Sequence, residues 1–98
     1  MTKTEIKNRL RNLEHLKGFE VQYKTATNTG AASIKITDTR FNKSIRIPYD
    51  YYYDTAWKIA ADYLITKNKI NITGFCWNEH KGTYTLLTDD FSTELVYI

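Results

Sequence analysis

The two histidines and the single cysteine are the residues whose chemistry best suits metal binding or nucleophilic catalysis. His15 and His80 lie far apart in the sequence, and Cys76 stands four positions before His80. Cys76 and His80 supply only two of the four ligands of a tetrahedral zinc site, and the sequence offers no second pair. We therefore expect Cys76 to be a buried core thiol and His80 to be an exposed turn residue.

Sequence motifs of the common enzyme classes are missing. The chain has no P-loop, no GxGxxG dinucleotide fingerprint, no HExxH zinc motif and no GxSxG nucleophile elbow. The sequence therefore predicts a protein that is not an enzyme and that uses no metal or cofactor.

Four carboxylates near the C-terminus form a second candidate set. They are Glu79, Asp89, Asp90 and Glu94. If they converge at one end of the C-terminal hairpins, they can bind a divalent ion for phosphodiester hydrolysis. The alternative is that they are solvated turn residues, because aspartate is favoured in turns.

Positive charge is concentrated in the first half of the chain. Residues 1–48 hold ten Lys and Arg against four Asp and Glu, a net charge of +6, and residues 49–98 hold four against seven, a net charge of −3. Several neighbouring cations that neutralise phosphates are the electrostatic signature of nucleic-acid binding. The alternative is a basic surface without a ligand. The candidate contacts are Lys7, Arg11, Lys35, Arg40, Lys43 and Arg46.

Tyrosines around residue 50 form the candidate protein-binding surface. Four of them fall within positions 49–53, and successive residues of a helix rotate by about 100°, so they cannot all face a core. We expect Tyr53 to face inward and Tyr51 and Tyr52 to be at least partly exposed. Exposed tyrosines are typical of protein–protein hot spots, and their alternative use is stacking on bases. The predicted protein-binding residues are Tyr51, Tyr52, Asp54, Glu79, Asp89 and Asp90.

A helix predicted over residues 50–68 is expected to position these tyrosines. Asp50 is the expected N-cap and Asn68 the expected left-handed closing residue. Trp57 is expected to be the largest buried side chain. The apolar stripe with helical period consists of Tyr53, Trp57, Ala60, Ala61, Leu64 and Ile65.

A first helix is predicted over residues 2–17. Thr2 and Glu5 have the spacing of a capping box, and Gly18 stands where a closing glycine belongs. The stripe expected to pack on the core consists of Ile6, Leu10, Leu13 and Leu16.

Alternating apolar and polar residues predict strands in the remainder of the chain. Three strands, expected to form an antiparallel meander, cover 19–24, 31–37 and 44–47, and two later strands cover 70–77 and 83–88. The tail 94–98 is expected to be a sixth strand or an irregular end. We predict a single α+β domain over residues 1–98, with two helices and an antiparallel sheet of five to six strands in the order α-β-β-β-α-β-β(-β).

The expected location is the cytoplasm of a bacterial host. The N-terminus is charged throughout, unlike a signal peptide, and no apolar run approaches the roughly 18 residues of a membrane span. The single cysteine excludes an internal disulfide. We therefore expect no membrane partner, and the sequence does not predict the oligomeric state.

The order helix (2–17), three strands (19–47), helix (50–68) resembles the plan of double-stranded-RNA-binding domains and covers about two thirds of the chain. Members of that family begin the second helix with a lysine-rich motif that contacts phosphates. Here the matching stretch is DYYYDTAWK, in which Lys58 is the single lysine. The chain therefore departs from the family at its principal RNA contact.

The chain also resembles small accessory proteins of phages and mobile elements, including anti-CRISPR proteins of low-GC bacteria. Its heavy use of Tyr, Asn, Thr, Lys and Ile is typical of AT-rich genomes. This resemblance implies a non-enzymatic inhibitor of a bacterial defence nuclease, such as a CRISPR effector, that occludes a protein or nucleic-acid-binding surface. The alternative function is a small basic nucleic-acid-binding module.

Overall fold

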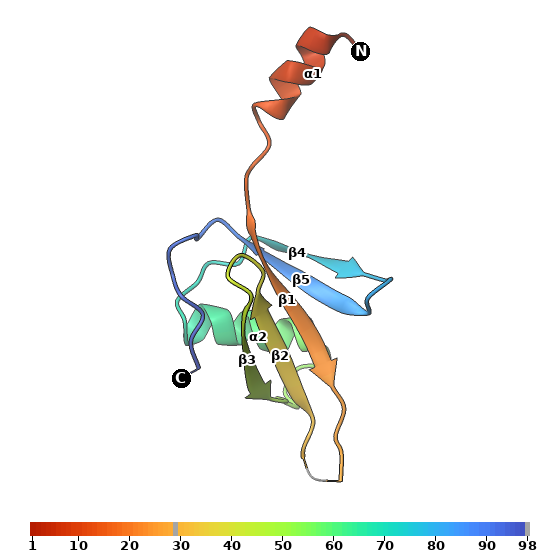
Figure 1. The fold of residues 1–98 in the computed structure, drawn as a ribbon, viewed down its shortest axis with the longest axis vertical. Helices are drawn as coiled ribbons and strands as arrows, with labels where there is room; N and C mark the ends of the chain where they lie inside the picture. The colour runs from red at the N-terminus through yellow and green to blue at the C-terminus, as the bar shows by residue number, and fades with distance from the viewer. Residues whose placement is uncertain (29, 98) are drawn as a thin grey trace.

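The computed structural model describes residues 1–28 and 30–97, which form two helices and five strands (Figure 1). The elements are α1 (Lys3–Leu10), β1 (Lys17–Lys24), β2 (Ser33–Asp38), β3 (Lys43–Pro48), α2 (Ala56–Thr66), β4 (Gly74–Asn78) and β5 (Thr83–Thr88). This order confirms the predicted α+β class.

All strand pairs in the sheet are antiparallel, and the strand order is β3-β2-β1-β5-β4. The first three strands form the predicted meander. The last hairpin then returns so that β5 pairs with β1, which leaves β3 and β4 as the two edges. Strands distant in the sequence therefore meet at the centre of the sheet.

The core lies between one face of the sheet and α2, which packs behind β1, β2 and β5 (Figure 1). Alternate residues of each strand point toward the helix, where burial of their apolar surface stabilises the fold. The fully buried side chains include Phe19, Ile34, Ile36, Leu64 and Leu86. No described helix covers the opposite face, which we call the open face.

The prediction that α2 begins at Asp50 was wrong. The helix begins at Ala56 with Thr55 as N-cap. Asp50 instead holds a turn, because its carboxylate accepts from the N–H of Tyr52 at 3.0 Å and its carbonyl accepts from the N–H of Tyr53 at 3.2 Å. An aspartate side chain that bonds nearby backbone competes with helix formation.

The buried stripe of α2 also differs from the prediction. Ile59, Ala60 and Leu64 are the buried residues, whereas Ile65 is 49% exposed and Trp57 is only partly buried. The left-handed residue after the helix is Lys69, with φ 58°, rather than Asn68. Asn68 is buried, and its side-chain oxygen accepts from the N–H of Val96 at 2.9 Å.

Helix α1 is shorter than predicted and projects away from the sheet (Figure 1). The capping box at Thr2 and Glu5 is present. However, α1 contacts none of the other described elements, and Ile6 and Leu10 are 43% and 59% exposed. The prediction that this stripe packs on the core was wrong, because the chain leaves the helix at Leu10 and runs extended into β1.

Two further predictions are corrected. Gly18 lies in β1, where a Cβ atom would come within 3.1 Å of the Thr85 methyl group, so glycine permits the close pairing with β5. Cys76 is exposed rather than buried, since it lies on the open face of edge strand β4.

The tail forms no strand over residues 94–97, and residue 98 lies outside the described residues. Its anchor is Leu95, which is fully buried. The irregular alternative for this tail is therefore the one observed over 94–97.

Candidate functional site

The tyrosine turn, residues 49–53, presents two rings to solvent. Tyr51 and Tyr52 are 84% and 86% exposed, which confirms their predicted exposure. Tyr53 points inward and its hydroxyl donates to the Asp62 carboxylate at 2.7 Å. That hydrogen bond raises the pKa of Tyr53 above its usual value.

Ring contacts fix the tyrosine turn in place. Tyr49 contacts Tyr51 with ring centroids 4.9 Å apart, and Tyr52 meets Tyr53 edge-on at 5.0 Å. Tyr49 also meets Tyr23 of β1 edge-on at 5.6 Å. The exposed rings are therefore held by partly buried ones, which lowers the entropy that they lose on binding.

A cleft of about 330 Å³, which we call the aromatic cleft, lies beside the tyrosine turn. Its walls include Tyr23, Tyr49, Trp77 and Tyr84. The rings of Trp77 and Tyr84 contact each other at 4.7 Å. Thr55 also lines the cleft, but its hydroxyl oxygen is buried and has no hydrogen-bond partner among the described residues. The walls of the cleft are therefore mainly aromatic.

Two of the predicted acidic residues lie at this end of the molecule. Asp54 lines the aromatic cleft, and Lys58 binds its carboxylate at 2.9 Å. This contact lowers the pKa of Asp54. Glu79 lies in the β4–β5 turn, which reaches the same cleft through Gly82, whose φ is 65°. The structure therefore brings Tyr51, Tyr52, Asp54 and Glu79 to one end.

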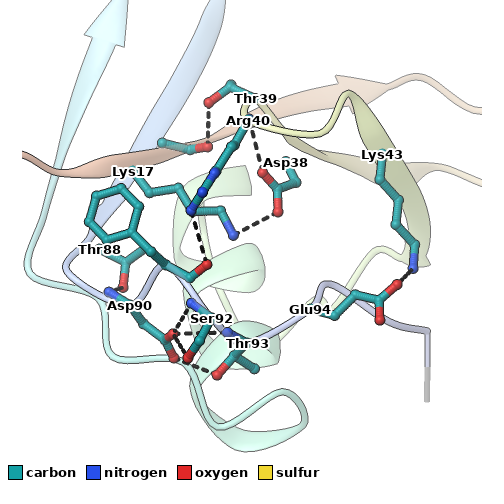
Figure 2. Close-up of polar contacts among 12 residues, drawn as sticks. Lys17, Asp38, Thr39, Arg40, Lys43, Thr88, Asp90, Ser92, Thr93 and Glu94 are labelled. Carbon is teal, nitrogen blue, oxygen red and sulfur yellow. Dashed lines mark hydrogen bonds and ion pairs between the residues drawn. The ribbon is translucent and has the colours of Figure 1, made fainter.

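Asp89 and Asp90 lie at the other end, because they follow the six residues of β5, a length of about 20 Å. The Asp90 carboxylate accepts from the N–H groups of Ser92 and Thr93, both at 3.0 Å, and from their hydroxyls (Figure 2). These bonds, chiefly those from Thr93, lower the pKa of Asp90 to about 2. The Asp90 carboxylate therefore stabilises the turn that follows β5.

The hypothesis that the four carboxylates converge was wrong. Glu79 is separated from Asp89 and Asp90 by strand β5. Glu94 pairs with Lys43 at 2.6 Å. Within residues 1–28 and 30–97, no group of three His, Cys, Asp or Glu side chains could hold a metal ion.

The six candidate nucleic-acid contacts are divided among three places. Lys7 and Arg11 belong to the projecting N-terminal helix and its C-cap. Arg40 donates to the Phe91 carbonyl at 3.3 Å, near the Lys43–Glu94 pair (Figure 2). Lys35 and Arg46 are directly opposite each other on the open face.

A buried ion pair lies beneath the Arg40 turn (Figure 2). Lys17 Nζ lies 2.7 Å from the Asp38 carboxylate, and both side chains are almost fully buried. Nζ also lies 4.8 Å from the centroid of the Phe19 ring, so the charge is surrounded by the carboxylate and an aromatic face. Sequence reasoning missed this pair. The sequence does contain a sign of it: Lys17 alternates with Phe19 and Val21, so its side chain lies on the core face of β1.

Protein-family models, curated proteins and solved structures contain no match to this chain. In the described residues, no helix is long and apolar enough to span a membrane.

Three aromatic residues of the cleft were missed at the level of sequence. They are Tyr23, Trp77 and Tyr84, which lie on three different strands. Tyr23 alternates in phase with Phe19 and Val21, so its local pattern is that of a core residue. These residues come together through the strand order of the sheet, because the pairing of β5 with β1 places Tyr84 opposite Val21.

Proposed function

We propose that this protein is a non-enzymatic binding module whose interface is the tyrosine turn together with the aromatic cleft. The observation that carries the proposal is the near-complete exposure of Tyr51 and Tyr52 in the same turn as Tyr49, which lines the aromatic cleft. Tyrosine supplies a large rigid contact area and a hydroxyl for hydrogen bonding, so such residues dominate many interfaces. The aromatic cleft could bind a side chain of the partner.

The partner in this proposal is a bacterial defence nuclease, and binding inhibits it by occlusion. Glu79 places negative charge beside the same surface, where the charge of Asp54 is offset in part by its pair with Lys58. Nuclease surfaces that hold nucleic acid are positively charged, since they neutralise phosphates. Electrostatic complementarity therefore favours docking of this end on such a surface.

Nuclease inhibition is the direct test. Purified RNA-guided nucleases from Gram-positive bacteria are assayed for DNA cleavage with an excess of the wild-type protein, the Tyr51→Ala/Tyr52→Ala variant or the Phe41→Ala variant. Phe41 is a matched control because it is 61% exposed and lies in the β2–β3 turn. We expect inhibition by the wild type and by the control, and its loss in the double variant. Full cleavage in every mixture would remove the inhibitor assignment.

A second candidate function is nucleic-acid binding by the open face. Lys35 and Arg46 stand opposite each other in register, where like charges destabilise a sheet, and neither has an acidic partner among the described residues. A bound phosphate would relieve this repulsion. No aromatic side chain of the described strands accompanies them on that face, so the ligand would be contacted through its backbone.

Salt-dependent binding to duplex DNA tests this second function. Replacing Lys35 and Arg46 by glutamine should weaken binding and reduce the slope of log affinity against log salt by about two. The matched control replaces Lys67 and Lys69, two exposed lysines flanking the end of α2. Absence of any mobility shift at low salt would exclude the function.

A further inference from the structure

Strand β4 is an unprotected edge of the sheet. Its sequence, Gly-Phe-Cys-Trp-Asn, has no charged residue and no proline. Phe75 and Trp77 are 49% and 50% exposed, and Cys76 is exposed between them. An edge strand carries a row of unpaired N–H and C=O groups, and an apolar one is a template for pairing with another strand.

The opposite edge has the usual protection. Strand β3 carries Lys43 and Arg46 and ends at Pro48. Charge and proline are the devices that keep edges from pairing. The contrast shows that protection is present on one edge and missing on the other.

The aromatic side chains of β4 are held in fixed positions. Phe75 stacks on Trp57 of α2 with ring centroids 4.0 Å apart and an interplanar angle of 12°. Trp77 contacts Tyr84 of β5 at 4.7 Å. Rings held in this way need little ordering on association.

We propose that β4 pairs with β4 of a second copy of this chain, forming a continuous ten-stranded antiparallel sheet. Cys76 is the middle residue of the five in β4, so a two-fold axis through it gives complete overlap of the strands. Phe75 then lies opposite the second copy's Trp77, and the reverse pairing is identical. A two-fold interface requires such a self-complementary patch.

A second copy fits this edge for two reasons. Because β4 is uncharged, pairing it with itself creates no like-charge contact. Aromatic residues also face aromatic residues across the strands, which is a favourable pairing. Helix α2 packs mainly on β1, β2 and β5, and its contact with β4 is the stack of Trp57 on Phe75.

The contact is small. Five residues a side are fewer than the 20–30 of a standard interface. We therefore expect a weak and reversible dimer.

Cysteine cross-linking tests the geometry. Opposite residues of antiparallel strands have Cα atoms about 4.5–5.5 Å apart, which is within the range of a disulfide. Mild copper-catalysed oxidation of the wild-type protein should produce a covalent dimer through Cys76. The matched control is Cys76→Ser/Ser44→Cys, since Ser44 is also exposed on the open face of an edge strand. Equal cross-linking of the control would show random collision and would overturn the proposal.

Sedimentation measures the association without a cross-linker. The wild type should show a rise in mass with concentration, and Trp77→Lys, which introduces the charge typical of protected edges, should weaken association at least tenfold. Circular dichroism reports whether this variant is folded, and the wild-type cross-linking result stands independently of it. A wild-type protein that stays monomeric and forms no disulfide dimer would overturn the proposal that β4 pairs with a second copy.

This inference does not rest on nuclease inhibition, although Trp77 belongs both to β4 and to the aromatic cleft. The Tyr51→Ala/Tyr52→Ala variant should dimerise like the wild type, because these residues lie outside β4. Loss of inhibition with retained dimerisation, or the reverse, distinguishes failure of one proposal from failure of the other.

Discussion

The Asp90 carboxylate organises the turn after β5 with two backbone and two side-chain hydrogen bonds. Its pKa falls from 3.8 to about 2 in the folded protein. A lowered pKa means that the folded state favours the ionised form. The resulting stability is present above pH 3.8 and is lost as the pH falls toward 2.

Asp90→Asn should therefore destabilise the protein at neutral pH by about 1–2 kcal/mol, after allowance for solvent screening. Urea unfolding between pH 2 and pH 7 measures the difference from the wild type. We expect the difference to shrink below pH 4 and nearly to vanish at pH 2. Asp89→Asn is the control, since Asp89 is exposed and lacks this turn network. A difference that does not change with pH would show that the charge is irrelevant.

The Lys17–Asp38 pair predicts strong coupling between two residues. Lys17→Met leaves the buried Asp38 carboxylate without its cation, which should cost about 3–5 kcal/mol. Replacing both residues, with Lys17→Met and Asp38→Leu, should cost far less than the sum of the single changes. Urea unfolding of the four proteins measures the coupling, and additive effects would contradict the pairing.

At the level of elements, period-two alternation predicted the five strands because it survives wherever one face is buried, although the fourth begins at Gly74 and not at residue 70 as predicted. Val21 and Ile36 illustrate this, since they lie in register on the core face. Helix boundaries were harder, because the Asp50 turn competes locally with the start of α2. The apolar stripe of α1 predicted that this helix packs on the core, but a local pattern does not show whether another element lies close enough to pack against it.

The candidate site divides in the same way. The exposure of Tyr51 and Tyr52 followed from helical rotation, although they lie in a turn rather than a helix. Local patterning could not have predicted the aromatic cleft, because Tyr23 and Tyr84 come together through the pairing of the first and last strands. Non-local strand order leaves no short-range signal.

Removal of α1 tests the assignment of stability to the sheet and α2. Deleting residues 1–13 should change the free energy of unfolding by less than about 0.5 kcal/mol, because an unpacked helix buries no apolar surface. Leu95→Ala is the positive control, since Leu95 is fully buried and its truncation should cost about 2–5 kcal/mol. A comparable loss on deletion of α1 would mean that the helix packs on the core in solution.

At the scale of the whole molecule, charge and shape are both uneven. Four cations of residues 1–11 lie on or beside the projecting α1, whereas the tyrosine turn and the aromatic cleft belong largely to the acidic half. The described chain measures 58 × 29 × 25 Å, and α1 extends along its longest axis (Figure 1). A basic arm is thus separated from the aromatic surface, so the two can contact different partners.

Small-angle X-ray scattering tests this shape. The Cα radius of gyration is 15.9 Å, whereas a compact domain of 98 residues is expected near about 13 Å. The excess comes from α1, so deletion of residues 1–13 should lower the measured radius by about 2–3 Å. Dilute samples keep the proposed β4 dimer dissociated, and Trp77→Lys supplies a second monomeric reference. If the full chain already scatters as a compact particle of about 13 Å, α1 folds back in solution and its apolar stripe has an intramolecular partner.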